Sequence, residues 1–232
     1  MIEGARPVIE AIRAGRRRVF EIRLPSTQRS AAQSELARLA RERGLPTREA
    51  DGRSVVAHAE PYPETSFESL LTGPTPRWLV ALDGVTDVGN LGSIARSAEA
   101  AGVGGLVLEY RRAPPLGPGA LRASAGAIEH LRVGRTPNLR RSLELARSEG
   151  LSVGVAESGG ASIEELGKRL RGELVLVLGS EENGTRNSIR KMADFELGIP
   201  LAGRVGSLGV SAAAAYLLLR IAEIRRAGES EG

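Results

Sequence analysis

The sequence predicts an α/β protein, in which a small N-terminal α/β domain precedes a larger domain built on a parallel sheet. Two observations lead to this fold class. From residue 77 onward, short apolar or β-branched runs alternate with helical stretches, which is typical of a parallel sheet that helices cover on both faces. Before that point, four of the twelve prolines of the 232-residue chain fall within residues 60–76, a density typical of a semi-rigid connection. We therefore expect a domain at residues 1–62, a proline-rich linker at 63–76 and a second domain at 77–232.

The N-terminal elements follow from apolar spacing and from stop signals. Apolar residues three and four apart predict a helix, and alternation with period two predicts a strand. Gly15 and Gly44 come just after two helical patterns and mark their ends. We expect a helix at 6–14, a strand at 17–25, a helix at 30–44, a strand at 54–60 and a short helical turn within the linker.

The second domain is expected to alternate strands with helices. The strands are expected at 78–85, 104–110, 151–158, 173–179 and 195–201. The helices are expected at 90–102, 138–150 and 186–194 and from about Val210 onward. Ligands of open parallel sheets bind beyond the carboxyl ends of the strands. The loops after Asp83, Gly179 and Ile199 are therefore the candidate site.

The last of these helices is apolar on every side in its first half. Val210, the alanines at 212–215 and the leucines at 217–219 leave no polar face. Such a helix is expected to be buried on nearly every side. The pattern leaves open whether the core or a partner subunit covers it.

Composition limits the chemistry that the chain can perform. It has no cysteine and only two histidines, His58 and His130, so we expect no zinc site and no other metal. The absence of cysteine fits a reducing cytoplasm. No signal-peptide core is present, and the longest apolar run, near residues 210–219, is too short to span a bilayer. We expect a cytoplasmic protein with no membrane partner.

The formal net charge of +4 is carried by 30 arginines against 2 lysines. Arginine forms forked contacts with phosphate and stacks on bases, so the composition permits nucleic-acid binding. A GC-rich genome gives the same bias, and the charge alone does not identify a partner.

The stretch DVGNLGSIARSAEAAG, residues 87–102, combines a buried helical stripe with an amide and a guanidinium that lie off that stripe. Asn90 is expected at or beside the N-cap. Arg96 can fold back toward the helix N-terminus, where free N–H groups favour anions. The alternative is a cap and a solvated arginine, and this stretch alone favours the alternative.

Two later loops are rich in glycine. Gly179 and Gly184 bracket Glu181 and Glu182, as expected where a backbone approaches a ligand, although an acidic pair beside a helix is also a common cap. Neither the P-loop pattern nor G-x-G-x-x-G occurs, which disfavours kinases, ATPases and dinucleotide-binding enzymes. A hydrolase nucleophile elbow would require glycine in place of Val205, so a hydrolase is also disfavoured.

Taken together, the three loops resemble the signature motifs of the SpoU/TrmH family. These motifs are N-L-G-x-x-x-R at 90–96, G-S-E-x-x-G at 179–184 and I-P-L-x-G-x-x-x-S-L-x-V-S at 199–211. The ordered trio spans residues 77–225, and the N-terminal stretch GARPVIEAIRAGRRRVFEI is similar to the L30e-like RNA-binding domain of members that modify ribosomal RNA. The resemblance implies an S-adenosylmethionine-dependent RNA ribose 2′-O-methyltransferase. It also implies a trefoil-knotted SPOUT domain and a homodimer with its sites near the subunit interface.

The resemblance assigns roles to single positions. It implies catalytic roles for Asn90, Arg96, Glu181 and Ser207. It implies a cofactor site formed by Gly179, Ile199, Leu208, Gly203 and Gly209. A ribose hydroxyl is a poor nucleophile and loses its proton as the methyl group transfers, so Arg96 beside an RNA phosphate would assist deprotonation while Asn90 orients the ribose. No metal is required.

One residue departs from the family pattern. The third motif usually reads S-L-N-V-S, and here Gly209 replaces the asparagine. An active enzyme is favoured because the other four polar site residues remain, with 23S ribosomal RNA as the expected substrate and transfer RNA second. A non-catalytic RNA-binding or ribosome-assembly protein stays open, as does an antibiotic-resistance methyltransferase. The sequence does not reveal the target nucleotide, because RNA is recognised largely through shape and unpaired bases.

Overall fold

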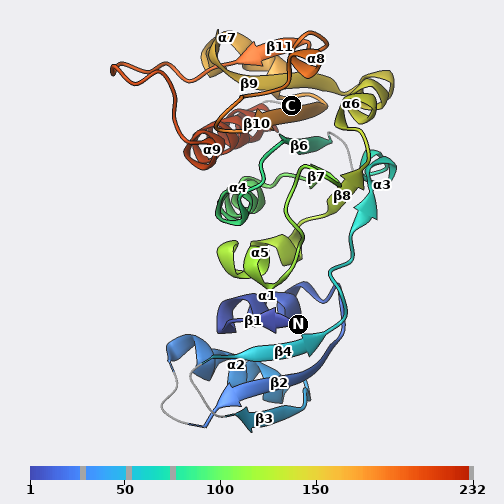
Figure 1. Ribbon diagram of the computed structural model, residues 1–232, viewed down its shortest axis with the longest axis vertical. Coiled ribbons are helices and arrows are strands. Elements are labelled where there is room, and N and C mark those ends of the chain that lie inside the picture. The colour runs from blue at the N-terminus through green and yellow to red at the C-terminus, as the bar shows by residue number, and fades with distance from the viewer. Residues whose placement is uncertain (27–29, 51–53, 74–76, 230–232) are drawn as a thin grey trace.

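A computed structural model describes residues 1–26, 30–50, 54–73 and 77–229, which are arranged around two β-sheets (Figure 1). A four-stranded sheet formed within the first 59 residues lies at the bottom of that view, and a seven-stranded sheet lies at the top. The last three residues of the expected linker, 74–76, and the chain end at 230–232 fall outside the described residues.

The smaller sheet has the strand order β1-β4-β2-β3. Strand β4 is antiparallel to β1 and β2, whereas β2 and β3 are parallel. Helix α1 ends at Gly15, which adopts a left-handed φ of 61°, and α2 opens with a capping box between Ser30 and Gln33. The elements are β1 (Ile2–Glu3), α1 (Ala5–Ala14), β2 (Val19–Pro25), α2 (Ala31–Glu42), β3 (Thr47–Ala50) and β4 (Val56–Ala59).

The larger sheet has the order β11-β9-β10-β6-β7-β8-β5, and every neighbouring pair is parallel. This confirms the predicted fold class. Its strands are β5 (Thr65–Ser66), β6 (Trp78–Asp83), β7 (Gly105–Glu109), β8 (Val133–Thr136), β9 (Ser152–Ala161), β10 (Leu174–Gly179) and β11 (Phe195–Leu197). The helical segments are α3 (Phe67–Leu71), α4 (Val88–Ala101), α5 (Pro118–Ala123), η1 (Ala127–His130), α6 (Leu139–Ser148), α7 (Ile163–Leu166), η2 (Gly167–Leu170), α8 (Asn187–Arg190) and α9 (Val210–Glu229).

Alternate side chains of the central strands enter two separate apolar cores. Leu79 and Ala81 of β6 pack on the face covered by α3 and α6, and Val80 and Leu82 pack on the opposite face. The second face is covered by α4 and α9, which also pack against each other. Because both faces are buried, β6, β7 and β10 are apolar up to their last residue. This explains why they were visible as continuous runs in the sequence.

The segment expected as a linker contributes structure to the larger sheet. Within it, β5 pairs with β8 at the edge of the sheet, and the buried Phe67 and Leu70 of α3 pack beneath it. The short helical turn expected there corresponds to α3. Neither β5 nor β8 was expected, because two-residue and polar strands give no apolar run.

The start of α9 at Val210 agrees with the sequence, but the expectation of burial on nearly every side is wrong for the single chain. Val210, Ala214 and Leu218 are buried, whereas Ala212, Tyr216 and Leu219 are exposed. The exposed residues are spaced four and three apart and form one apolar stripe along the helix.

The two sheet units are joined by a polar junction buried beneath α1. The Arg17 guanidinium binds the Glu129 carboxylate, and their side chains are 3% and 0% exposed. Burial raises the pKa of Glu129 above its usual 4.5, and the hydrogen bond with Arg17 acts in the opposite direction. Burial also raises the pKa of Tyr62, whose hydroxyl donates to the Leu131 carbonyl. The junction therefore fixes one unit against the other.

Candidate functional site

The carboxyl ends of neighbouring strands meet at one edge of the larger sheet. Gly179, which ends β10, is paired with Asp83, which ends β6, and β9 and β11 follow on the other side of β10. The loops that leave β10 and β11 therefore start from the same edge, where parallel sheets bind their ligands.

The loop after β10 is a tight turn that requires glycine. The backbones of Ser180 and Gly184 exchange hydrogen bonds of 2.9 and 3.2 Å. A Cβ atom on Gly179 would lie 2.2 Å from the carbonyl carbon of Gly184, and Gly184 itself has a φ of +60°. Glu181 and Glu182 are exposed in this turn. The N-cap of α8 is Arg186 and has no side-chain cap, so the acids do not serve the capping role that the sequence left open.

Two carboxylates hold the end of this loop by its backbone. The Thr185 N–H donates to Glu157 Oε1 at 3.2 Å, and the next N–H, of Arg186, donates to Asp83 Oδ2 at 2.8 Å. The Arg186 side chain forms ion pairs with Asp83 at 2.7 Å and with Glu109 at 2.9 Å. Since Asp83 is only 1% exposed, this buried network fixes where the loop leaves the sheet.

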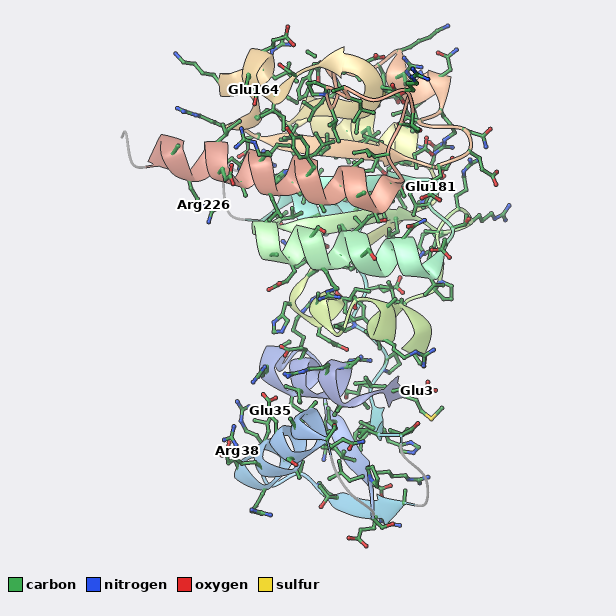
Figure 2. All side chains as sticks on the ribbon, turned by 90° about the vertical axis from the view of Figure 1, so that its left-hand side faces the viewer. Glu3, Glu35, Arg38, Glu164, Glu181 and Arg226 are labelled. Atoms are coloured by element: carbon green, nitrogen blue, oxygen red, sulfur yellow. The ribbon has the colours of Figure 1, made fainter. Side chains whose placement is uncertain are left out.

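A cavity of about 270 Å³ lies at this edge. Five residues predicted from the sequence line it: Gly179, Glu181, Ile199, Ser207 and Leu208. Apolar side chains such as Leu178, Leu197 and Leu217 form much of its wall. The other polar side chains in its lining are Glu157, Ser158 and Ser180. Figure 2 shows Glu181 beside the N-terminal end of α9.

The loop that leads from β11 to α9 forms the outer wall of the cavity. The Ser158 hydroxyl donates to the Gly206 carbonyl at 2.8 Å and ties this loop to β9. Gly203 lines an adjoining hollow of about 410 Å³ instead of the cavity. Gly209 lies next to Glu181, because a Cβ atom there would be 3.2 Å from Glu181 Oε1.

Helix α4 positions Asn90 differently from the sequence expectation. The N-cap is Asp87, whose carboxylate accepts the Asn90 N–H at 2.7 Å, so Asn90 lies in the first turn. Gly92 allows α5 to approach, because a Cβ atom there would be 2.4 Å from the Ala123 Cβ.

Arg96 is exposed and lines a groove of about 690 Å³ between α4, η1 and α1. This groove shares no lining residue with the 270 Å³ cavity. Within the described part of one chain, Asn90 and Arg96 are therefore absent from the cavity lining that holds the other predicted polar residues.

Sequence reasoning missed Glu157, Ser158 and Arg186. Glu157 and Ser158 follow the apolar run of β9 directly, and acids and serines in that place are typical of a solvated loop. A useful signal was available, because β9 was itself an expected strand of the sheet and its carboxyl end deserved the same inspection as its neighbours.

The structure gives two further negative findings. Among the residues that it describes, no group of three or more His, Asp and Glu side chains is placed to hold a metal ion. In the same residues, no helix combines the length and the apolar character needed to cross a bilayer.

Comparison with protein families finds two matches. The model of the SpoU rRNA Methylase family matches residues 77–219. A model described as RNA 2′-O ribose methyltransferase substrate binding matches residues 1–60.

Individual relatives match over most of the chain. A protein of Archaeoglobus fulgidus, described as an uncharacterized tRNA/rRNA methyltransferase, is 32% identical over 83% of this chain and 86% of its own length. The 23S rRNA (guanosine-2′-O-)-methyltransferase RlmB of Pseudomonas putida is 33% identical over 90% of each chain. Among solved structures, the SpoU methyltransferase AviRb of Streptomyces viridochromogenes, crystallised with S-adenosylmethionine, superposes with a TM-score of 0.80 at 25% identity, covering 98% of this chain and 90% of its own.

Proposed function

Because the chain belongs to the SpoU rRNA methylase family, we propose that it methylates a ribose 2′-hydroxyl in 23S ribosomal RNA. The enzyme is an RNA methyltransferase that depends on S-adenosylmethionine. The choice of 23S RNA over transfer RNA is supported by the similarity to RlmB along 90% of both chains and by the match of residues 1–60 to a substrate-binding model.

The observation that supports the catalytic assignment most strongly is the convergence of distant segments on one cavity. Gly179 and Glu181 come from the loop after β10, and Ser207 and Leu208 come from the loop before α9. These are the loops in which the sequence contains the second and third motifs. A ligand of about the cavity's size, near the lower end of the ~300–1,000 Å³ range of small-molecule pockets, would contact both motifs at once.

The cavity fits S-adenosylmethionine in the chemistry of its donors and walls. Leucine and isoleucine side chains offer an apolar surface for an adenine ring, and Glu157 and Glu181 offer negative charge. No arginine, lysine or histidine is among the described residues that line it, as suits a cofactor with a positive sulfonium. When bound, the cofactor supplies an electrophilic methyl group.

The chain's own polar residues would then position the ribose and help to remove its proton. We assign Arg96 to an RNA phosphate, where its charge favours the ionised form of the neighbouring hydroxyl. Asn90 would orient the ribose, and Glu181 and Ser207 would hold the reacting groups at the mouth of the cavity.

RNA binding by the N-terminal unit has a physical basis on β2 and its neighbours. Phe20 is 45% exposed, and the Arg18 guanidinium lies 5.3 Å from the centre of its ring. Arg23 and Arg48 are also exposed on β2 and β3. Exposed aromatic rings and arginines together are suited to unpaired bases and phosphates.

We include a homodimer and a knotted C-terminal domain in the proposal. The exposed apolar stripe of α9, formed by Ala212, Tyr216 and Leu219, is a surface that a second copy would bury. The return of the chain from β11, at one edge of the sheet, to α9 against β10 and α4 is compatible with a knot.

Labelled cofactor provides the test. The purified protein is incubated with methyl-labelled S-adenosylmethionine in two separate reactions, one with unmodified 23S RNA and one with bulk transfer RNA. Label on a ribose 2′-oxygen of 23S RNA is expected. Label on transfer RNA alone would mean that transfer RNA, and not 23S RNA, is the substrate. The enzyme assignment fails if no RNA is labelled and calorimetry detects no cofactor binding.

A second candidate function is an RNA-binding protein without catalysis, which Gly209 favours. An asparagine at position 209 would have to displace Glu181 Oε1, which lies 3.2 Å from the added Cβ. Because that atom ends a flexible and exposed side chain, we expect Gly209→Asn to change the free energy of unfolding by less than about 0.5 kcal/mol. Transfer that appears only in Gly209→Asn, with equal RNA affinity in both proteins, would support the second candidate. Transfer by the unaltered protein excludes it.

A further inference from the structure

Glu157 is a nearly buried carboxylate in the wall of the cavity. It lies in β9, directly after Ala156, which is paired with Leu178 of β10. Its side chain is 14% exposed, and it is one of the residues that line the cavity. The sequence motifs do not include it.

The two oxygens of this carboxylate have different environments. Oε1 accepts the Thr185 N–H at 3.2 Å and lies 3.8 Å from Arg190 Nε. Oε2 makes no hydrogen bond to any residue that the structure describes. Since one oxygen is held by the backbone, the carboxylate is oriented before a ligand arrives.

The surroundings of Oε2 favour a ligand that donates a hydrogen bond. The nearby position 184 is glycine, and even an added Cβ there would be 3.8 Å from Oε2. Much of the remaining lining is apolar, and the other carboxylate of the cavity, Glu181, is exposed. Oε2 is not one of the buried side-chain atoms without a partner, so it is open to the cavity, and a ligand that supplies a donor there would form a charge-assisted hydrogen bond.

We propose that Glu157 is a cofactor-binding residue whose Oε2 accepts a hydrogen bond from an O–H or N–H donor of S-adenosylmethionine. This inference rests on the proposed function, because it takes the cavity as the cofactor site. The donor has two possible sources, the adenosine moiety (its ribose hydroxyls or its adenine amino group) and the α-ammonium group of the methionine moiety, and the experiment separates them.

The test measures the dissociation constant of S-adenosylhomocysteine by calorimetry, with no RNA present. Glu157→Gln keeps an oxygen that accepts the Thr185 N–H but loses the charge, and we expect binding about 10- to 100-fold weaker. Glu182→Gln is the matched control, because Glu182 lies in the neighbouring turn but does not line the cavity, and its affinity should be unchanged. Melting temperatures without ligand verify that the variants fold.

A second ligand identifies the donor. 5′-Methylthioadenosine keeps the whole adenosine moiety and lacks the α-ammonium group. If Glu157→Gln weakens both ligands equally, the donor lies in the adenosine moiety, and if it weakens only S-adenosylhomocysteine, the donor is the α-ammonium group.

Two results overturn the inference and can be told apart. Unchanged affinity in a folded Glu157→Gln, with loss of affinity only in Glu157→Ala, would mean that Glu157 merely holds Thr185. Failure of the unaltered protein to bind either ligand would remove the inference together with the proposed function.

Discussion

Gly179 shows how one missing side chain shapes the site. An added Cβ would be 2.2 Å from a backbone carbon of Gly184, so the turn that carries Glu181 could not close. We expect Gly179→Ala to lower the free energy of unfolding by about 1–3 kcal/mol, as overpacked sites do, and to weaken S-adenosylhomocysteine binding about 10-fold or more. Thermal melting and calorimetry measure these two effects.

The matched control for this substitution is Gly172→Ala. Nothing lies within 4 Å of a Cβ atom at Gly172, and that residue is exposed. The free energy of unfolding of Gly172→Ala should stay within about 0.5 kcal/mol of that of the unaltered protein. Equal effects of the two substitutions would contradict the role assigned to close packing at Gly179.

The elements that could be predicted from the sequence are those whose burial is complete. Strands β6, β7 and β10 are buried on both faces and appear as unbroken apolar runs. Strands β3 and β5 are short and partly exposed, so only tertiary pairing reveals them. For the site, the motif loops could be recognised, and the carboxyl end of the expected strand β9 offered a signal for Glu157. The role of Arg186 could not be predicted, because its carboxylate partners Asp83 and Glu109 lie on strands that become neighbours only in the folded sheet.

The junction between the two sheet units contains the buried ion pair of Arg17 and Glu129, which gives a prediction about stability. Removing Arg17 by Arg17→Met leaves the Glu129 carboxylate without its partner in a fully buried position. Breaking such a pair typically costs about 3–5 kcal/mol. Arg13→Met is the control, because Arg13 is 45% exposed in its ion pairs with Glu10 and Glu35, and exposed pairs contribute little to stability.

The loss of stability that Arg17→Met causes should depend on pH. Burial raises the pKa of Glu129 above 4.5 in the folded protein, so the native state retains a proton that the unfolded chain releases. The contribution of Glu129 to the free energy of unfolding is present below pH 4.5 and is lost as the pH rises through the higher pKa that Glu129 has in the folded protein. Without Arg17 the native value rises further, so we expect the deficit of Arg17→Met in thermal melting to be larger at pH 8 than at pH 5. A deficit that is constant across this range would contradict the assignment.

At the level of the whole protein, the exposed apolar stripe of α9 predicts a homodimer. Tyr216 is 40% exposed and Leu219 43% exposed, and a second copy that covers them would remove that surface from water. Light scattering should give about twice the 24.5 kDa of one chain. Tyr216→Glu should shift the protein to monomer, whereas Tyr110→Glu, at a residue that is 60% exposed outside α9, should not. A monomer before any substitution would exclude the dimer.

A dimer would also explain why Arg96 and the cavity occupy separate surfaces of one chain. Leu219, in the exposed stripe of α9, lines the Arg96 groove, whereas Leu217 of the same helix lines the cavity. Packing two copies along α9 would bring the groove of one chain toward the cavity of the other. We therefore expect Arg96→Ala chains, and Gly179→Ala chains at an S-adenosylmethionine concentration too low to saturate their weakened site, to be nearly inactive separately.

When the two inactive chains are mixed and refolded together, the composite site makes a specific prediction. Each heterodimer contains one site with an intact Arg96 from the Gly179→Ala chain and an intact cavity from the Arg96→Ala chain, and the other site carries both substitutions. Methyl transfer should therefore return to about a quarter of the unaltered rate, because half of the dimers are mixed and each has one working site of two. If the mixture stays inactive while light scattering shows dimers, Arg96 serves the cavity of its own chain and must reach it by a movement of α4.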